Sequence, residues 1–198
     1  MSITEIFAVI FGVISVYLTV KENIWCWPTG IIMVILYIFV FYDVKLYSDV
    51  ILQVIYIFMQ AYGWYHWVYG DKNKKALPVT RVKNLPMVLY AIVIFAGAAG
   101  WGYLMHTYTD AAFPYIDSLV VTASLVAQWF LAKKYLESWV IWILVDVVAV
   151  TIYALKALYL TSGLYVVFLV LAIMGLLEWY KSYKKTGNHL LSKKLKKA

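Results

Sequence analysis

Four side chains that could bind a ligand follow one another at helical spacing within one apolar segment. Trp139, Trp142, Asp146 and Tyr153 are three, four and seven residues apart, which places two indoles, a carboxylate and a phenol on one helix face. Asp146 lies about 13 Å from the start of the segment at 1.5 Å per residue. Aromatic faces beside one carboxylate can hold a flat cationic ring. Alternatively, Asp146 pairs with Lys156 or another polar group and only holds helices together.

A second polar stripe has spacings of three, four, four and three residues. Its members are Gln53, Tyr56, Gln60, Trp64 and Trp67. Amide groups can donate to and accept from a polar ligand, and they can equally join helices by hydrogen bonds. Gln128 is a similar but weaker candidate on another segment. The sequence alone favours neither interpretation of these amides.

No motif for catalysis accompanies the stripes. The sequence lacks a phosphate-binding glycine loop, a His-Glu-x-x-His zinc motif and a nucleophile elbow. Cys26 is the single cysteine, so no internal disulfide can form. Glu22 and Glu137 fall near segment ends, where we expect them to be solvated. An intramembrane enzyme that used Asp146 as acid or base would need a His or a second carboxylate at the same depth. We find none, and therefore expect no enzymatic activity, metal or cofactor.

The composition requires a lipid environment. Hydrophobic residues make up 65% of the chain and charged residues 14%, against about 45–50% and about 25% in soluble domains. A soluble chain of 198 residues could not bury that much apolar surface. A helix needs about 20 apolar residues to cross a bilayer. The sequence predicts seven such helices, at Ile3–Val20, Trp27–Tyr42, Asp49–Val68, Leu85–Leu104, Tyr115–Ala132, Glu137–Leu155 and Thr161–Tyr180.

The positive charges indicate how these helices are oriented. Of the 17 Lys and Arg residues, 15 fall after the first, third and fifth helices or in the tail, and only Lys45 and Lys156 fall on the other side. The positive-inside rule therefore predicts an N-terminus outside and a C-terminus in the cytoplasm. The net charge of +7 comes from these flanking residues. We therefore expect contact with the lipid bilayer and no binding of nucleic acid.

Weak internal similarity predicts a duplication. Three matches are 112 residues apart: Gly63 with Gly175, Trp67 with Trp179, and Leu46-Tyr47 with Leu158-Tyr159. Two further matches are 115 residues apart: Glu22 with Glu137, and Trp27 with Trp142. The predicted repeats cover 3–68 and 115–180, with a linker helix at 85–104. Three crossings change the side of the membrane and the fourth restores it, so the repeats run in parallel, as in SWEET-type transporters. We expect one transmembrane domain, 1–182, and a basic cytoplasmic tail, 183–198.

Several segments resemble the PnuC family of bacterial vitamin transporters, over nearly the whole chain. They are Trp25-Cys26-Trp27-Pro28-Thr29-Gly30, Leu46-Tyr47-x-x-x-x-Leu52-Gln53, Tyr62-Gly63-Trp64-Tyr65-x-Trp67, Phe113-Pro114-x-x-Asp117-Ser118 and Trp139-x-x-Trp142. The resemblance implies a SWEET-like fold of seven helices in two three-helix halves. It also implies a homotrimer in which each protomer has its own transport path.

The resemblance further implies a function and a site. The best-known members carry nicotinamide riboside without ion or ATP coupling, and a cytoplasmic kinase then traps the substrate by phosphorylation. Trp139 and Trp142 would line the cavity, and Gln53 and Gln60 would face it from the other half. Nicotinamide riboside carriers would have Asn where this chain has Asp146.

This departure leaves the substrate open. A carboxylate only accepts hydrogen bonds, whereas an amide also donates them. Asp146 suits the pyridinium of nicotinamide riboside and equally the thiazolium and amino group of thiamine. Met174 and Lys156 also replace an expected amide and a neutral residue. We expect a facilitator for nicotinamide riboside, with thiamine or another vitamin as the alternative. A scaffold that transports nothing is the less favoured possibility, and it would have its polar stripes paired between helices.

Overall fold

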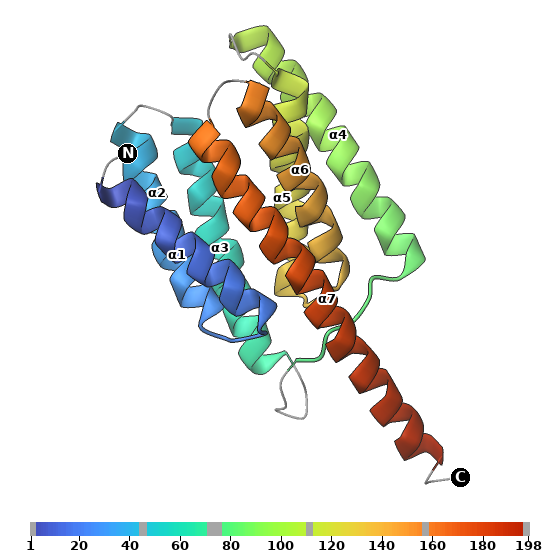
Figure 1. Ribbon diagram of the computed structural model, residues 1–198. Helices are drawn as coiled ribbons and strands as arrows, with labels where there is room; N and C mark the ends of the chain where they lie inside the picture. The colour runs from blue at the N-terminus through green and yellow to red at the C-terminus, as the bar shows by residue number, and fades with distance from the viewer. Residues whose placement is uncertain (1–2, 44–46, 71–76, 110–112, 156–158, 196–198) are drawn as a thin grey trace.

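Seven helices make up the bundle in the computed structural model, which describes residues 3–43, 47–70, 77–109, 113–155 and 159–195 (Figure 1). They are α1 (Ile3–Val20), α2 (Cys26–Asp43), α3 (Tyr47–Tyr69), α4 (Asn84–Tyr108), α5 (Pro114–Ala132), α6 (Glu137–Leu155) and α7 (Tyr159–Leu195). The all-helical membrane fold expected from the sequence is confirmed. Lys45, Lys72, Lys74, Lys75 and Lys156, on which part of the charge argument rests, lie outside the described residues.

The helix boundaries follow local signals in the sequence. Pro114 occupies the first turn of α5, where its missing N–H costs no hydrogen bond. The seventh helix differs from its prediction, because it continues from Tyr180 to Leu195 and projects beyond the bundle (Figure 1). Lys and Leu are strong helix formers, so the basic segment extends the helix.

Six of the described helices are long and apolar enough to cross a membrane. The exception is α3, which has 23 residues but carries the polar stripe, including Gln53 and Gln60. It nevertheless packs between α2 and α5 inside the bundle. Its neighbours bury Gln60 and half-bury Gln53.

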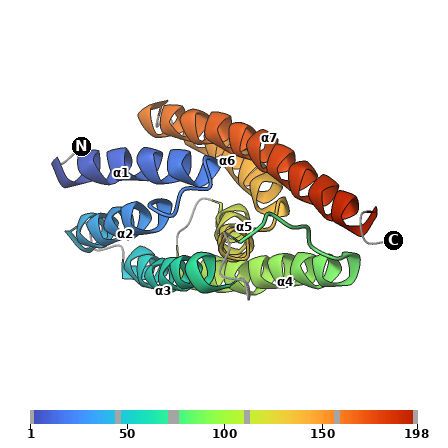
Figure 2. The same ribbon diagram turned by 90° about the horizontal axis from the view of Figure 1, so that it is seen from below.

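Helix contacts close a ring of six helices. Going round it, α1 packs on α2, α2 on α3, α3 on α5, α5 on α6, α6 on α7, and α7 on α1 (Figure 2). Within the described residues, α4 touches only α5 and lies outside the ring. The triplets α1–α3 and α5–α7 run in the same direction, and the chain ends lie at opposite ends of the bundle (Figure 1). This arrangement is the predicted pair of parallel repeats.

A hydrophobic core lies at one end of the ring. We call this the lysine-rich end because it is surrounded by Lys21, Arg81, Lys83, Lys133 and Lys134. Four indoles from four helices form its centre. Trp27 meets Trp67 edge to face, with centroids 5.2 Å apart, and Trp139 meets Trp179 in the same way at 5.4 Å. Trp67 and Trp179 join the two halves, with centroids 5.9 Å apart.

The repeat has one register throughout, and this corrects part of the sequence prediction. Trp139, not Trp142, is equivalent to Trp27: each lies against a glycine of the third helix of its half, Gly175 or Gly63. Five backbone hydrogen bonds of the α1–α2 turn recur 112 residues later in the α5–α6 turn. The proposed 115-residue shift is therefore wrong. Leu46 and Leu158, used in the matching, lie outside the described residues.

Candidate functional site

Asp146 lies in the middle of α6 and is only 4% exposed, so its carboxylate does not face the surrounding lipid. Tyr165 of α7 is within electrostatic reach of it. Among the described residues the carboxylate has no hydrogen-bond or ion-pair partner, and the alternative partner Lys156 lies outside them. A buried acid without a partner is costly in a membrane, which makes this position the first candidate for ligand contact.

Phenol rings gather near this acid. Tyr153 of α6 and Tyr165 of α7 stack with centroids 5.2 Å apart and an interplanar angle of 16°. Phe168 packs edge-on against Tyr165 at 6.1 Å. Tyr37 of α2 brings a phenol from the other half within electrostatic reach of Tyr165. The helical spacing on α6 predicted Tyr153 as a site residue. It gave no sign of Tyr165 or Tyr37, since neither belongs to a polar stripe of its own helix.

The two indoles of α6 have different surroundings. Trp139 is 2% exposed, lies over Gly175 and meets Trp179 edge to face, so packing holds it in the core. Its Nε1 has no partner among the described residues. Trp142 is half-buried at the margin of the core, one helical turn before Asp146. Trp142 is therefore the indole with a partly accessible face.

The α3 stripe divides along its length. Gln60 is buried, and its amide oxygen lies over Gly30 of α2. The Tyr56 hydroxyl lies near Ser124 of α5, in the other half. Trp64 is 40% exposed, which separates it from the buried part of the stripe. Gln53 of α3 and Gln128 of α5 are both half-buried.

Reciprocal contacts hold the halves together at the lysine-rich end. The Trp67 Nε1 donates to the carbonyl oxygen of Leu131 at 3.2 Å, and the Trp179 Nε1 donates to that of Thr19 at 3.0 Å. These acceptors are themselves 112 residues apart. Each bond therefore repeats the other about a pseudo-twofold axis between the halves.

An ion pair completes this closed end. Lys134 is 3% exposed, and its Nζ lies 2.7 Å from Glu22 Oε2 and 4.6 Å from the Trp67 ring centroid. Glu22 and Lys134 occupy equivalent turns, and both have left-handed φ angles, of 54° and 59°. The Lys134 Nζ also donates to the carbonyl oxygen of Leu77 at 2.8 Å.

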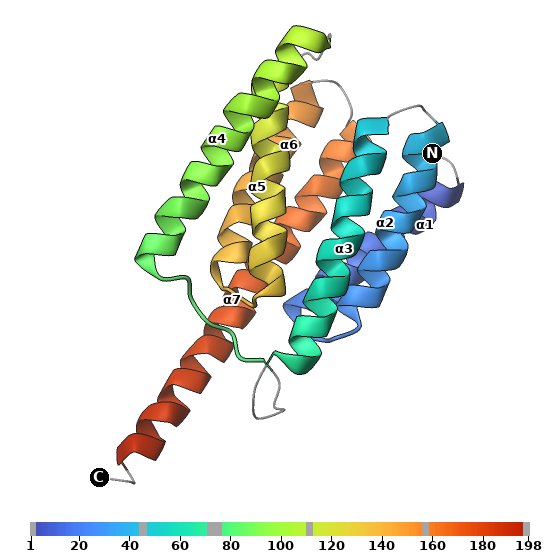
Figure 3. The same cartoon turned by 180° about the vertical axis from the view of Figure 1, so that it is seen from behind.

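The segment 77–83 crosses the lysine-rich end between α3 and α4 (Figure 3). Thr80 forms a parallel bridge with Tyr135. Glu137 accepts from Arg81 Nε at 2.8 Å and from the Val82 N–H at 3.1 Å. Glu137 is 8% exposed, so our expectation that this residue is solvated is wrong. The segment 77–83, which we call the strap, covers the start of α6, and nothing in the local sequence around Glu137 indicates this cover.

The described helices form two parallel triplets joined by an extra crossing, with a buried acid at mid-depth and half-buried aromatic rings near it. These features are those of a parallel-repeat membrane transporter. A family model described as "Nicotinamide mononucleotide transporter" matches residues 2–181. The chain therefore belongs to this family, that of the PnuC transporters, and the resemblance found in the sequence is confirmed.

Characterised relatives support this assignment. The nicotinamide riboside transporter PnuC of Escherichia coli K12 is 28% identical, over 95% of this chain and 89% of the relative. The nicotinamide riboside transporter PnuC of Neisseria mucosa is 26% identical, over 90% of this chain and 72% of the relative. The riboflavin/roseoflavin transporter RibM of Streptomyces davaonensis is 24% identical, over 92% and 86%. A crystal structure of the vitamin B3 transporter PnuC superimposes with a TM-score of 0.73 at 24% identity, covering 92% of this chain and 82% of that one.

Proposed function

We propose that this protein imports nicotinamide riboside across the bacterial inner membrane. The observation that carries the proposal is Asp146, a buried acid without a partner among the described residues, set among phenol rings inside a ring of helices. The pyridinium of the riboside is a flat cation, which such surroundings bind by charge attraction and cation–π contacts. Relatives whose names refer to nicotinamide riboside support this choice.

The binding site would lie between the two halves. Asp146 and the partly accessible face of Trp142 would hold the ring, and Tyr153 would contribute from the same helix face. Gln53, Tyr56 and Gln60 would offer polar contacts from the other half, with Gln128 from α5. Trp139 would form the packed wall beneath the site, and Trp64 would contribute only if α3 rotates. Each assignment is a proposal to be tested residue by residue.

A phosphorylated substrate fits this interior less well. The seven predicted spans contain no Lys or Arg. A phosphate group carries close to two negative charges and is usually held by cations. Placed beside Asp146 it would meet like charge. The charge distribution therefore favours the nucleoside over the mononucleotide named in the family description.

Transport would proceed by rocking of the triplets about the site. The structure is closed at the lysine-rich end, which the positive-inside rule assigns to the cytoplasm, with the N-terminus outside. Release would separate Glu22 from Lys134 and break the reciprocal Trp67 and Trp179 hydrogen bonds. With no ATP-binding motif in the chain, net uptake would depend on phosphorylation by a cytoplasmic kinase. As the resemblance implies, three copies would assemble, each with its own path.

Thiamine is the second candidate, and Asp146 is the observation that favours it. The thiazolium ring is also a flat cation, and the thiamine amino group can donate to a carboxylate, which accepts two hydrogen bonds or more. RibM, a relative named for riboflavin and roseoflavin, supports keeping a second vitamin as an alternative.

Calorimetry on the purified protein with nicotinamide riboside, nicotinamide mononucleotide and thiamine tests the proposal. We expect the riboside to bind best and Asp146→Ala to weaken it at least about tenfold, by loss of a buried charge–charge contact. Lys185→Ala, which removes an exposed charge at the far end of α7, is the matched control and should bind normally. Unchanged affinity in Asp146→Ala would exclude that residue from the site, and preferential thiamine binding would reassign the substrate.

A further inference from the structure

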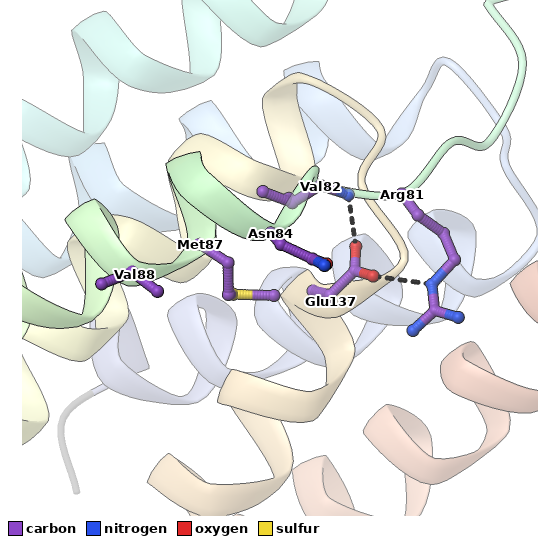
Figure 4. Close-up of a pocket in the computed structure, with 6 residues that line it drawn as sticks. All are labelled: Arg81, Val82, Asn84, Met87, Val88 and Glu137. Atoms are coloured by element: carbon purple, nitrogen blue, oxygen red, sulfur yellow. Dashed lines mark hydrogen bonds and ion pairs between the residues drawn. The ribbon is translucent and has the colours of Figure 1, made fainter.

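Two cavities on the outer surface share one cation, Arg81, in their linings. Figure 4 shows Arg81 in the first of them. The first has a volume of about 540 Å³ and lies between the start of α4 and the start of α6, lined by Arg81, Val82, Asn84, Met87, Val88 and Glu137. The second has a volume of about 290 Å³ and lies between α6 and α7, with mainly apolar walls that include Leu136, Val140, Leu176 and Leu177. Neither cavity belongs to the interior site around Asp146.

The geometry of Arg81 prepares it for an anion. Its Nε donates to the buried Glu137 carboxylate, and its two Nη atoms point away from that carboxylate (Figure 4). The side chain of Arg81 is 57% exposed, against 10% for Glu137. The hydrogen bond that Arg81 donates to Glu137 also raises the pKa of Arg81, so the guanidinium stays charged. A guanidinium fork fixed in this way matches the geometry of a phosphate group.

Arg81 lies at the level of the lipid headgroups. Three membrane-crossing helices begin or pass there: α4 starts at Asn84, α6 starts at Glu137, and α7 passes at Tyr180. Lys83 adds an exposed positive charge beside the cavity. In the proposed orientation this level faces the cytoplasmic leaflet, where anionic lipids attract basic pockets between helices.

Apolar tracks continue from both cavities toward the middle of the membrane. On α4 the first cavity is followed by Ile92 and Phe95, exposed by 57% and 67%. On α6 the second is followed by Leu144, exposed by 62%, and on α7 by Val170, exposed by 52%. Within the described residues α4 makes no contact with α6 or α7, so the two tracks diverge on either side of α6.

We propose that this surface is a binding site for one diacyl phospholipid with an anionic headgroup. The phosphate accepts hydrogen bonds from the Arg81 Nη groups, one acyl chain follows α4, and the other follows the groove between α6 and α7. The surface combines one cationic side chain with two apolar tracks. A phospholipid would contact all three, whereas a free anion would contact only Arg81. The proposal does not depend on the transported substrate.

Native mass spectrometry and thermal unfolding of the detergent-purified protein, with added phosphatidylglycerol or phosphatidylethanolamine, test the proposal. We expect one phosphatidylglycerol molecule bound per protomer, with a raised melting temperature and a smaller effect of phosphatidylethanolamine. Val140→Trp fills the α6–α7 groove and leaves the Arg81–Glu137 pair intact. It should lower the lipid-bound fraction about tenfold. Val68→Trp is the matched control and should bind normally, since Val68 is 42% exposed and lies on α3, which lines neither cavity and carries neither apolar track.

Variants of the charged residues measure the contribution of the lipid headgroup to binding separately from that of the acyl chains. Arg81→Gln should lose the preference for phosphatidylglycerol. Because it leaves Glu137 buried without its cation, the double variant Arg81→Gln/Glu137→Gln is measured beside it and should show the same loss in a folded protein. Retention of the lipid in Val140→Trp and in the double variant would overturn the proposal. So would equal stabilisation by inorganic phosphate, or a change in oligomeric mass instead of lipid binding, which would assign the surface to a second copy of the chain.

Discussion

At the residue scale, glycine and tryptophan positions explain how the core closes. A Cβ atom at Gly175 would lie 2.5 Å from the Trp139 ring, and one at Gly63 would lie 2.2 Å from the Trp27 ring. The repeated spacing to Trp67 and Trp179 singled out both glycines in the sequence. The helical spacing of α6, however, predicted Trp139 on the ligand-binding face. Helical periodicity places a side chain on a face, but it does not show which neighbouring helix has a glycine ready to receive an indole.

Gly175→Ala tests this packing. The added methyl group meets a ring that is itself held by Trp179, so we expect a loss of about 1–3 kcal/mol of unfolding free energy from overpacking. Gly163→Ala on the same helix is the control, since no atom lies within 4 Å of its added Cβ. There the reduced backbone freedom should leave stability unchanged or slightly raised. Chemical unfolding in mixed micelles measures both, and equal effects would show that Trp139 moves freely.

At the element scale, the two interhelical turns α1–α2 and α5–α6 are the least predictable part of the fold. Their backbones match hydrogen bond for hydrogen bond, yet their residues at the left-handed position are Glu22 and Lys134. The two residues meet across the pseudo-twofold axis and attract one another because their charges are opposite. The equivalent positions therefore carry different residues, and a search for identical residues does not find them. The helices themselves were predictable, since apolar length and flanking charge decide where a chain crosses the membrane.

The Glu22–Lys134 pair gives a prediction for these turns. Glu22→Gln leaves a nearly buried Lys134 without its countercharge, so we expect a loss of about 3 kcal/mol of unfolding free energy. The double variant Glu22→Leu/Lys134→Met should recover most of that loss. Glu178→Gln serves as the control, because its pair with Lys181 is exposed and contributes about 0–1 kcal/mol. Similar losses in Glu22→Gln and Glu178→Gln would contradict the importance of the buried pair.

At the scale of the whole molecule, the sequence predicted the number of helices, their order and the parallel repeat. It could not predict the closed ring, because ring closure depends on contacts between helices far apart in the chain, such as α1 with α7. Nor could it place the strap 77–83, whose partners Lys134 and Glu137 lie more than 50 residues away.

The orientation of the molecule can be tested directly. With Cys26→Ala as background, Ile3→Cys and Lys185→Cys place single thiols near opposite ends of the bundle, at exposed positions. We expect a membrane-impermeant maleimide to label the first in intact cells and the second only after permeabilisation. The reverse labelling pattern would invert the assigned sides and place the closed end outside.

The ion pair on the pseudo-twofold axis also bears on how such a chain can arise. In a symmetric dimer of identical three-helix units, the residue at this place would face its own copy, so glutamate would oppose glutamate. Fusion of the units into one polypeptide removes that constraint. Because the connecting helix α4 joins the two units, the interface between them can carry complementary charges. A dimer of identical units could place only identical residues there.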